Sequence, residues 1–115
     1  MQDCKELDVL SITTTVGSLA AAQALAHEIL DRRLAACVQL EPGLTSLYRW
    51  KGQLCEEPEV RLVIKTAPGC EAALQSLFAQ HHPYELPQFL CAPMRASETY
   101  GAWLRGEVLP DDQAG

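Results

Sequence analysis

The chain has 115 residues, 48% of them hydrophobic, which predicts a single domain over residues 1–115 with an ordered core at about 7–108. Its net charge of −6 argues against partners that require a basic surface, namely nucleic acid and anionic membranes. No apolar run reaches the ~18 residues of a membrane span, and no signal-peptide pattern opens the chain. The five cysteines are scattered and odd in number, and without a secretory signal they indicate a cytoplasmic protein with reduced thiols.

Along the chain, the first two predicted elements are a strand at Leu7–Thr15 and an amphipathic helix. β-branched residues favour the extended strand, and Gly17 ends it. Ser18 is a good N-cap for the helix, because its hydroxyl can accept a backbone N–H of the first turn. The residues expected on the buried face of this helix are Leu19, Ala22, Leu25, Ala26, Ile29 and Leu30.

The stretch Arg33–Thr66 predicts two long antiparallel strands joined by a tight turn at Lys51-Gly52. Glycine adopts a positive φ at no steric cost, which suits a two-residue hairpin turn. Pro42-Gly43 predicts a bulge or break in the first arm, and Pro58 predicts an edge or a bulge in the second. After the turn, an apolar row alternates with a more polar row: Val60, Leu62 and Ile64 against Arg61, Val63 and Lys65.

The arms of this hairpin, roughly 16 and 14 residues, far exceed the usual strand length of ~5–6 residues. A hairpin this long overhangs a small domain, and its exposed edges need a partner. The residues at the turn have large side chains: Tyr48, Arg49, Trp50 and Lys51. Contact with a neighbouring subunit explains such side chains better than exposure to solvent. We therefore predict that the protein oligomerises through this hairpin.

The second half of the chain predicts two helices separated by a strand. The first helix spans about Glu71–Gln80 and ends because Pro83 disfavours helical geometry at the preceding residue. A short strand follows at Gln88–Met94, Ser97 caps the next helix, and the tail at Leu109–Gly115 is expected to fray. The residues expected to be buried are Leu74, Leu77 and Phe78 in the first helix and Tyr100, Trp103, Leu104 and Val108 in the second.

The order of predicted elements is β-α-β-β-α-β-α, which indicates an α+β fold. The first six elements match the ferredoxin-like βαββαβ sandwich, in which two βαβ halves interleave into one antiparallel sheet with helices on one face. The C-terminal helix and the long central hairpin are additions to that plan. The sheet face without helices includes Val9 and Val63, which are too apolar to face water, and this also favours association.

His81-His82 is the clearest candidate for chemistry, because paired imidazoles suit copper, zinc or nickel. Adjacent residues rarely bring both rings to one ion, although a helix end bent by Pro83 is one place where they can. His81 also lies seven residues after Leu74 on the apolar stripe, so a packed structural role and a pocket role stay open as alternatives. The nearest further donors in the chain, which spacing does not bring together, are Cys70, Glu71 and Glu85.

Acidic residues crowd the second hairpin arm at Glu56, Glu57 and Glu59. They fit either a solvated edge, with Arg61 and Lys65 as candidate ion-pair partners, or a ligand site at a subunit boundary. Catalysis finds little support, because the chain has no G-x-S-x-G motif, no phosphate-binding glycine loop and no cysteine at a telling spacing from a histidine. We therefore expect a protein that is not an enzyme and needs no organic cofactor.

Several motifs, in order and at matching spacing from about Val9 to Arg105, resemble the CutA family of divalent-cation tolerance proteins. They are RLAACV at 33–38, PG at 42–43, SLYRWKG at 46–52, EV at 59–60, LVIKT at 62–66, HHPYELP at 81–87 and YGAWL at 100–104. The resemblance implies a ferredoxin-like subunit in a tight homotrimer shaped like the PII signalling proteins, with the long hairpins forming intersubunit sheets. It also implies a role in tolerance of divalent metals, with copper binding in some members.

The resemblance makes His81 and His82 the expected metal ligands, with copper(II) or another divalent ion as the bound metal. Some metal-binding members carry a cysteine near the end of the first strand, where this chain has Thr14, a poor ligand for soft metals. The likeness to PII proteins offers an alternative: a signalling or adaptor trimer that binds a small molecule or a protein in clefts between subunits. The residues expected to line such clefts are Tyr48, Trp50, Lys65, His81 and Tyr84. A purely structural trimer is the third alternative.

Overall fold

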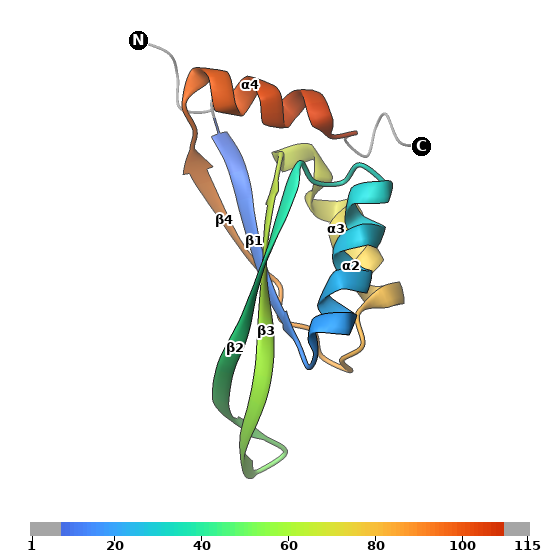
Figure 1. The fold of residues 1–115 in the computed structure, drawn as a ribbon, viewed down its shortest axis with the longest axis vertical. Helices are drawn as coiled ribbons and strands as arrows, with labels where there is room; N and C mark the ends of the chain where they lie inside the picture. The colour runs from blue at the N-terminus through green and yellow to red at the C-terminus, as the bar shows by residue number, and fades with distance from the viewer. Residues whose placement is uncertain (1–7, 110–115) are drawn as a thin grey trace.

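A computed structural model of the protein describes residues 8–109 and shows a twisted four-stranded sheet with two helices on one face (Figure 1). The strand order β2-β3-β1-β4, with neighbouring strands antiparallel, is the predicted ferredoxin-like arrangement, so the α+β fold is confirmed. The elements in chain order are β1 (Asp8–Val16), α2 (Leu19–Asp31), β2 (Cys37–Trp50), β3 (Gln53–Thr66), the short 3₁₀ helix η1 (Pro68–Cys70), α3 (Glu71–His81), β4 (Leu90–Arg95) and α4 (Glu98–Glu107).

The hairpin of β2 and β3 turns where the sequence predicts. Its two corner residues, Lys51 and Gly52, have positive φ angles of 51° and 79°, as a two-residue hairpin turn of the primed type requires. The predicted bulge is also present, since Gly43 has a φ of 85° and the register of the ladder shifts between Glu41 and Leu44.

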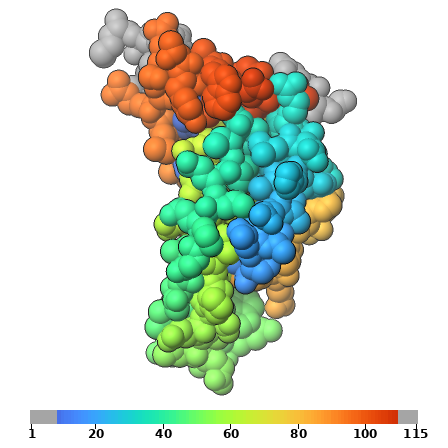
Figure 2. Space-filling view, in the orientation of Figure 1, coloured from blue at the N-terminus to red at the C-terminus, as the bar shows by residue number. Residues whose placement is uncertain are grey.

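The outer half of the hairpin extends beyond the sheet. β1 pairs with β3 from Val60 to Thr66, whereas among residues 8–109 the outer part of β3, residues 53–59, pairs with β2 alone. The molecule is consequently elongated, with extents of 49 × 31 × 22 Å, and the hairpin projects at one end (Figures 1 and 2). Pro58 lies in this outer half, at an edge of the sheet as expected.

Helices α2 and α3 cover one face of the sheet and close the core. The alternation in β3 is confirmed, because Val60, Leu62 and Ile64 are buried while the residues between them are half-buried. Both predicted N-caps form: Ser18 accepts the N–H of Ala21, and Ser97 accepts that of Tyr100. The buried helix residues are Ala22, Leu25, Ala26 and Ile29 in α2 and Leu74, Leu77 and Phe78 in α3, whereas Leu19 and Leu30 are exposed.

Helix α4 lies across one end of the sheet, with a different buried face from the predicted one (Figure 1). Leu104 and Val108 are buried as expected, but Tyr100 and Trp103 are 43% and 47% exposed. Gly101 lies on the buried face, where an added Cβ would lie 3.4 Å from Cβ of Ala96 in the preceding loop and 3.0 Å from the guanidinium of Arg105. The face of α4 that carries Gly101 and Leu104 therefore points inward, and the two aromatic rings lie outside.

The ends of the described region differ slightly from expectation. β4 begins at Leu90 rather than Gln88, and the predicted strand residue Leu7 and the predicted frayed residues 110–115 lie outside the described residues. Leu109, which is described, donates its N–H to the carbonyl of Arg33 at 2.8 Å and is not frayed. None of the helices within residues 8–109 has the length and hydrophobicity needed to cross a membrane.

Replacing Gly52 tests how strongly the turn stabilises the hairpin. The Gly52→Ala variant should lose about 1–2 kcal/mol of unfolding free energy, because an L side chain disfavours the positive φ at this corner. The matched control is Gly106→Ala in α4, where an added Cβ meets nothing within 4 Å, and this variant should gain about 0.5–1 kcal/mol. Urea unfolding measures both, and wild-type stability in Gly52→Ala would contradict the expected role of the turn.

Candidate functional site

The loop at residues 82–89, between α3 and β4, lies beside the end of β1 and makes contacts with it. β4 pairs with β1 only as far as Thr13, which leaves the last residues of β1 without a strand on that side within the described chain. His82, the first residue of the loop, has extended angles (φ −75°, ψ 133°), as expected for a residue before proline. The loop therefore ends α3 and brings its side chains to the end of β1.

His82 is the buried histidine of the pair, with 8% of its surface exposed. Its Nδ1 accepts the backbone N–H of Tyr84 at 3.1 Å, so the neutral ring carries its proton on Nε2. Nε2 lies 2.9 Å from Oγ1 of Thr14, which is fully buried, and donates to it. The imidazole thus binds the loop backbone through Nδ1 and β1 through Nε2, and it packs against Phe78.

The environment of His82 favours the neutral ring. Burial lowers the pKa of His82, and the backbone of Thr15 and the carboxylate of Glu59 act in the opposite direction to a smaller extent. A proton on Nδ1 would also remove the acceptor of the Tyr84 N–H. The folded protein consequently resists protonation of this ring.

A second hydrogen bond joins the loop to the hairpin. The Tyr84 hydroxyl donates to Oε2 of Glu59 at 2.6 Å, and Glu59 is 8% exposed. Burial and, after it, the Glu59 carboxylate raise the pKa of Tyr84 far above its ordinary value, so the phenol stays a donor at physiological pH. Through His82 and Tyr84, the loop is anchored to both β1 and β3.

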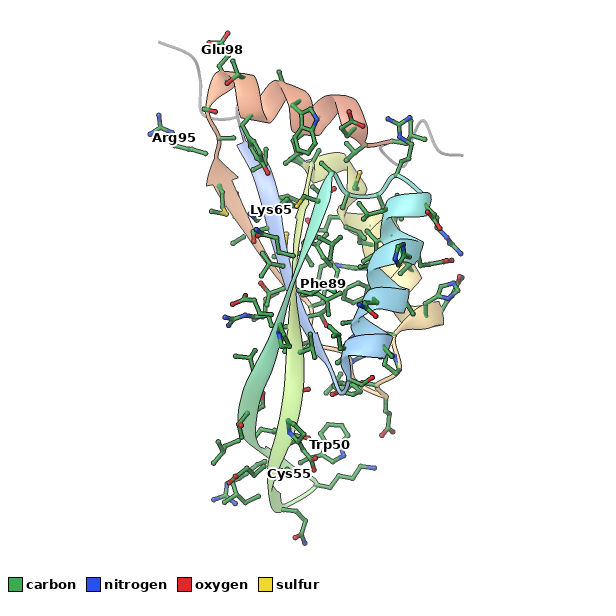
Figure 3. The ribbon with its side chains drawn as sticks, viewed as in Figure 1. Trp50, Cys55, Lys65, Phe89, Arg95 and Glu98 are labelled. Carbon is green, nitrogen blue, oxygen red and sulfur yellow. The ribbon has the colours of Figure 1, made fainter. Side chains whose placement is uncertain are left out.

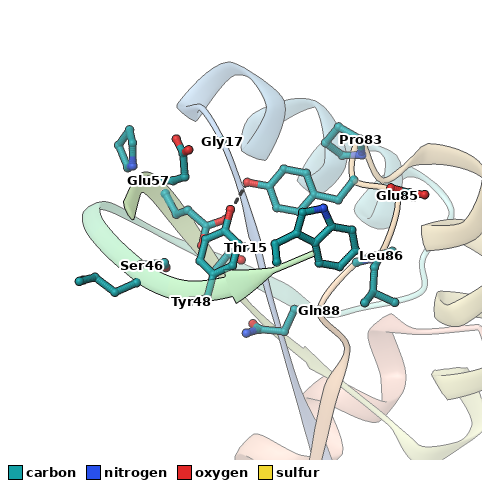
Figure 4. A pocket seen from close by; sticks show the side chains of 15 residues that line it. Thr15, Gly17, Ser46, Tyr48, Glu57, Pro83, Glu85, Leu86 and Gln88 are labelled. Carbon is teal, nitrogen blue, oxygen red and sulfur yellow. Dashed lines mark hydrogen bonds between the residues drawn. The ribbon is translucent and has the colours of Figure 1, made fainter. Parts of the chain in front are cut away.

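A groove of about 990 Å³ separates the outer hairpin from this loop (Figure 4). Figure 4 shows Tyr48 and Glu57 on the hairpin side, and Pro83, Glu85 and Leu86 on the loop opposite. Its walls combine aromatic rings, prolines and carboxylates. The lining residues are Thr15, Gly17, Ser46, Leu47, Tyr48, Trp50, Glu57, Pro58, Glu59, Pro83, Tyr84, Glu85, Leu86, Pro87 and Gln88.

The structure brings three of the predicted cleft residues together and separates two. Tyr48 and Trp50 from the hairpin and Tyr84 from the loop all line the groove. Lys65 does not, because it pairs with Ser11 in the inner half of β3, far from the turn that carries Trp50 (Figure 3). His81, the fifth candidate, also lies outside the groove.

His81 faces α2 rather than the groove. Its Nε2 is 3.2 Å from the guanidinium of Arg32 and 3.6 Å from Oε1 of Glu28. Packing of His81 on the apolar stripe of α3, one of the alternatives left open by the sequence, does not occur, since its side chain is 39% exposed and His82 is the packed ring. The stripe ends at Phe78, one turn earlier.

The two histidines do not form a metal site within one subunit. Both nitrogens of His82 are engaged in hydrogen bonds, and a cationic guanidinium lies beside His81. No three histidine, cysteine or acidic side chains are grouped as metal ligands in residues 8–109. Thr14 does occupy the position that the resemblance suggests, facing His82, so a cysteine in its place would lie next to that ring.

Sequence reasoning did not identify the roles of two charged residues. Glu59 is a nearly buried partner of Tyr84 rather than one more solvated acid of the hairpin edge. Arg61 pairs with Glu41 through two contacts of 3.0 and 3.1 Å, not with the acids after the turn. The apolar neighbours of Glu59 at Pro58 and Val60 gave only a weak signal of its burial.

The stability of the protein should fall as the pH drops below about 6.5, the ordinary pKa of histidine. In that range unfolded His82 takes up a proton that the folded, buried ring resists, so acid favours the unfolded state. Melting temperatures between pH 8 and pH 5 should show this slope in wild type and in the control variant His27→Gln, whose ring is exposed on α2. The variant His82→Gln should show a flatter slope, and an unchanged slope would contradict the assignment.

Comparison with known proteins identifies the family of this chain. The family model described as CutA1 divalent ion tolerance protein matches residues 10–107. The chain is 41% identical over 103 residues to the divalent-cation tolerance protein CutA of Yersinia pestis (strain Pestoides F), covering 89% of this chain and 87% of that protein.

Two solved structures share the fold at similar coverage. The divalent cation tolerance protein (Cut A1) of Thermus thermophilus is 34% identical, with a TM-score of 0.84 over 88% of this chain and 99% of that one. The PII-like protein CutA from Nostoc sp. PCC 7120 is 28% identical, with a TM-score of 0.82 over 88% and 98%. The matched motifs, the fold and these relatives agree: the chain belongs to the CutA1 divalent ion tolerance protein family.

Proposed function

We propose that this protein contributes to tolerance of divalent cations, and that it acts by binding, as a homotrimer, rather than by catalysis. The observation that carries the proposal is the family match over residues 10–107, with relatives that are named for this tolerance. The geometry of the histidine pair and of the hairpin supports the separate parts of the proposal.

The contact between Thr14 and His82 supports a role without catalysis. A hydroxyl 2.9 Å from an imidazole has the spacing of a nucleophile and its general base. Here Nε2 already carries the proton, because Nδ1 accepts the N–H of Tyr84, so the ring cannot take a proton from Thr14. Thr14 is also fully buried, out of reach of a substrate.

Exposed strand edges and apolar side chains support the trimer. The outer half of β3 pairs only with β2 within the described residues, and all six residues of β4 are exposed. Such edges invite strand pairing with another chain. Large apolar side chains on these edges are exposed as well: Leu47, Leu54, Leu90 and Met94. Association of the hairpin and edge strand of one subunit with those of another would cover the unpaired edges and the apolar side chains.

Folding of such a trimer is coupled to assembly. The melting temperature should therefore rise with protein concentration, because mass action favours the assembled, folded state. Light scattering on the same samples should give three times the mass of the 12.6 kDa chain. A monomeric mass together with a melting temperature independent of concentration would contradict the proposal.

We further propose that copper(II) or another divalent ion binds at His81 and His82, with the remaining ligands supplied by another subunit. The exposure of His81 and the nearby carboxylate of Glu28 support this position. His82 can take part only by giving up one of its two hydrogen bonds, so the binding should be weak.

Calorimetric titration with copper(II) and zinc(II) tests the histidines. The variant His81→Ala should lose roughly tenfold or more in affinity, corresponding to about 1.4 kcal/mol. The variant Thr14→Cys should bind more tightly than wild type, since a thiolate would then face His82. The control His27→Ala removes an exposed imidazole from α2 and should change nothing. Equal affinities in wild type and the three variants would contradict the metal assignment. Growth in copper of cells that carry each variant would test tolerance itself.

A second candidate function is ligand binding in the groove, as expected for a PII-like signalling or adaptor protein. The convergence of Tyr48, Trp50 and Tyr84 on a space of about 990 Å³ favours it. This volume is sufficient for a small molecule or for a side chain of a partner protein.

A further inference from the structure

We propose that the groove beside the hairpin binds an organic ammonium ion, the protonated form of a small aliphatic amine. This inference rests on the second proposed function, ligand binding in the groove. It does not depend on a metal at the histidine pair.

The side chains that line the groove combine the two groups that recognise organic cations. The rings of Tyr48, Trp50 and Tyr84 line the groove, and aromatic faces attract cations. Carboxylates come from both walls: Glu57 and Glu59 from the hairpin and Glu85 from the loop. Figure 4 shows Glu57 on the hairpin side of the groove, with Tyr48, and Glu85 on the loop side. An alkylammonium ion can pair with the carboxylates while its methylene groups contact the rings.

Glu59 gives the groove a fixed negative group. It is a carboxylate at 8% exposure that also lines the groove, and the Tyr84 hydroxyl holds its Oε2 at 2.6 Å. An ionised carboxylate accepts hydrogen bonds on both oxygens, so one contact with Tyr84 leaves further acceptor capacity. A nearly buried acid with a single defined neighbour is a preorganised partner for a cationic ligand.

An ammonium group of the protein already occupies the rim of this groove. Nζ of Lys51 lies 5.5 Å from the centre of the Trp50 ring and 3.7 Å from Oε2 of Glu85. The Lys51 side chain is 70% exposed, so an incoming ligand can displace it. Lys51 therefore shows that the rim of the groove accommodates an ammonium group, and this group should compete with an external amine.

Other classes of ligand fit the groove less well. An anion would meet three carboxylates and a chain of net charge −6. A neutral apolar molecule would desolvate the carboxylates without pairing them. A metal ion needs several converging donors, and residues 8–109 hold no group of three acidic, histidine or cysteine side chains arranged for one. An organic cation satisfies both the rings and the acids.

The test uses 1,4-diaminobutane as the cationic probe and 1,4-butanediol as a neutral probe of the same length. In a Trp103→Phe background, Trp50 is the remaining tryptophan and reports on the groove. The diamine should change its fluorescence saturably, and added salt should weaken the effect, whereas the diol should have no effect.

Calorimetry with the diamine then compares matched variants of the full chain. Glu59→Gln, which keeps an acceptor for Tyr84, and Trp50→Leu should each weaken binding roughly three- to thirtyfold. Lys51→Met should strengthen binding a few-fold by removing the competing ammonium group. The control Glu98→Gln removes one acid from the exposed start of α4 and should leave the affinity unchanged. Melting curves confirm that each variant is folded.

Three results would overturn the proposal: no saturable response to the diamine, an equal response to the diol, or weaker binding by Lys51→Met. Copper(II) titrations of the same proteins separate the two proposed functions. Loss of diamine binding in Glu59→Gln with copper affinity retained supports an independent groove. If the wild-type protein binds copper(II) but not the diamine, the groove proposal is rejected and the metal proposal is retained.

Discussion

The ladder between β2 and β3 is the interaction on which the rest of the molecule depends. Its inner half is held in the sheet by β1, and its outer half continues past the sheet supported by β2 alone within the described residues. That overhang forms one wall of the groove, carries Tyr48 and Trp50, and exposes the apolar residues Leu47 and Leu54. A subunit of this shape has an unsatisfied edge, so its architecture already favours association with other copies.

A short chain of hydrogen bonds connects the two candidate sites. The N–H of Tyr84 binds the ring of His82, and the hydroxyl of the same tyrosine binds Glu59 in the groove. The loop is thereby fixed against β1 at one end and against β3 at the other. Protonation of His82 at Nδ1 would break the bond that positions Tyr84, and a metal ion on that nitrogen would do the same, so the two sites share one structural element.

Much of the fold was predictable from local patterns in the sequence. Gly52 marked the turn, the Pro42-Gly43 pair marked the bulge, and period-two alternation in β3 gave the buried face. Features set by packing between distant segments were not predictable in this way. The inward face of α4 carries Gly101 and Leu104 rather than the aromatic rings, and the pairing of Arg61 with Glu41 follows from a register that the bulge shifts. The burial of His82 rather than His81 depends on the direction in which the loop leaves α3. A periodic pattern in the sequence contains no information on that direction.

The dependence of the outer hairpin on neighbouring subunits is tested most directly by amide hydrogen exchange of β3. The amides of residues 53–59 that point away from β2 have no strand partner within the described part of one subunit. If other subunits pair with or cover this edge, these amides should exchange nearly as slowly as those of the inner half, residues 60–66, in the assembled protein. Rapid exchange at residues 53–59 beside slow exchange at residues 60–66 would show that the hairpin stands free and would contradict its role in assembly.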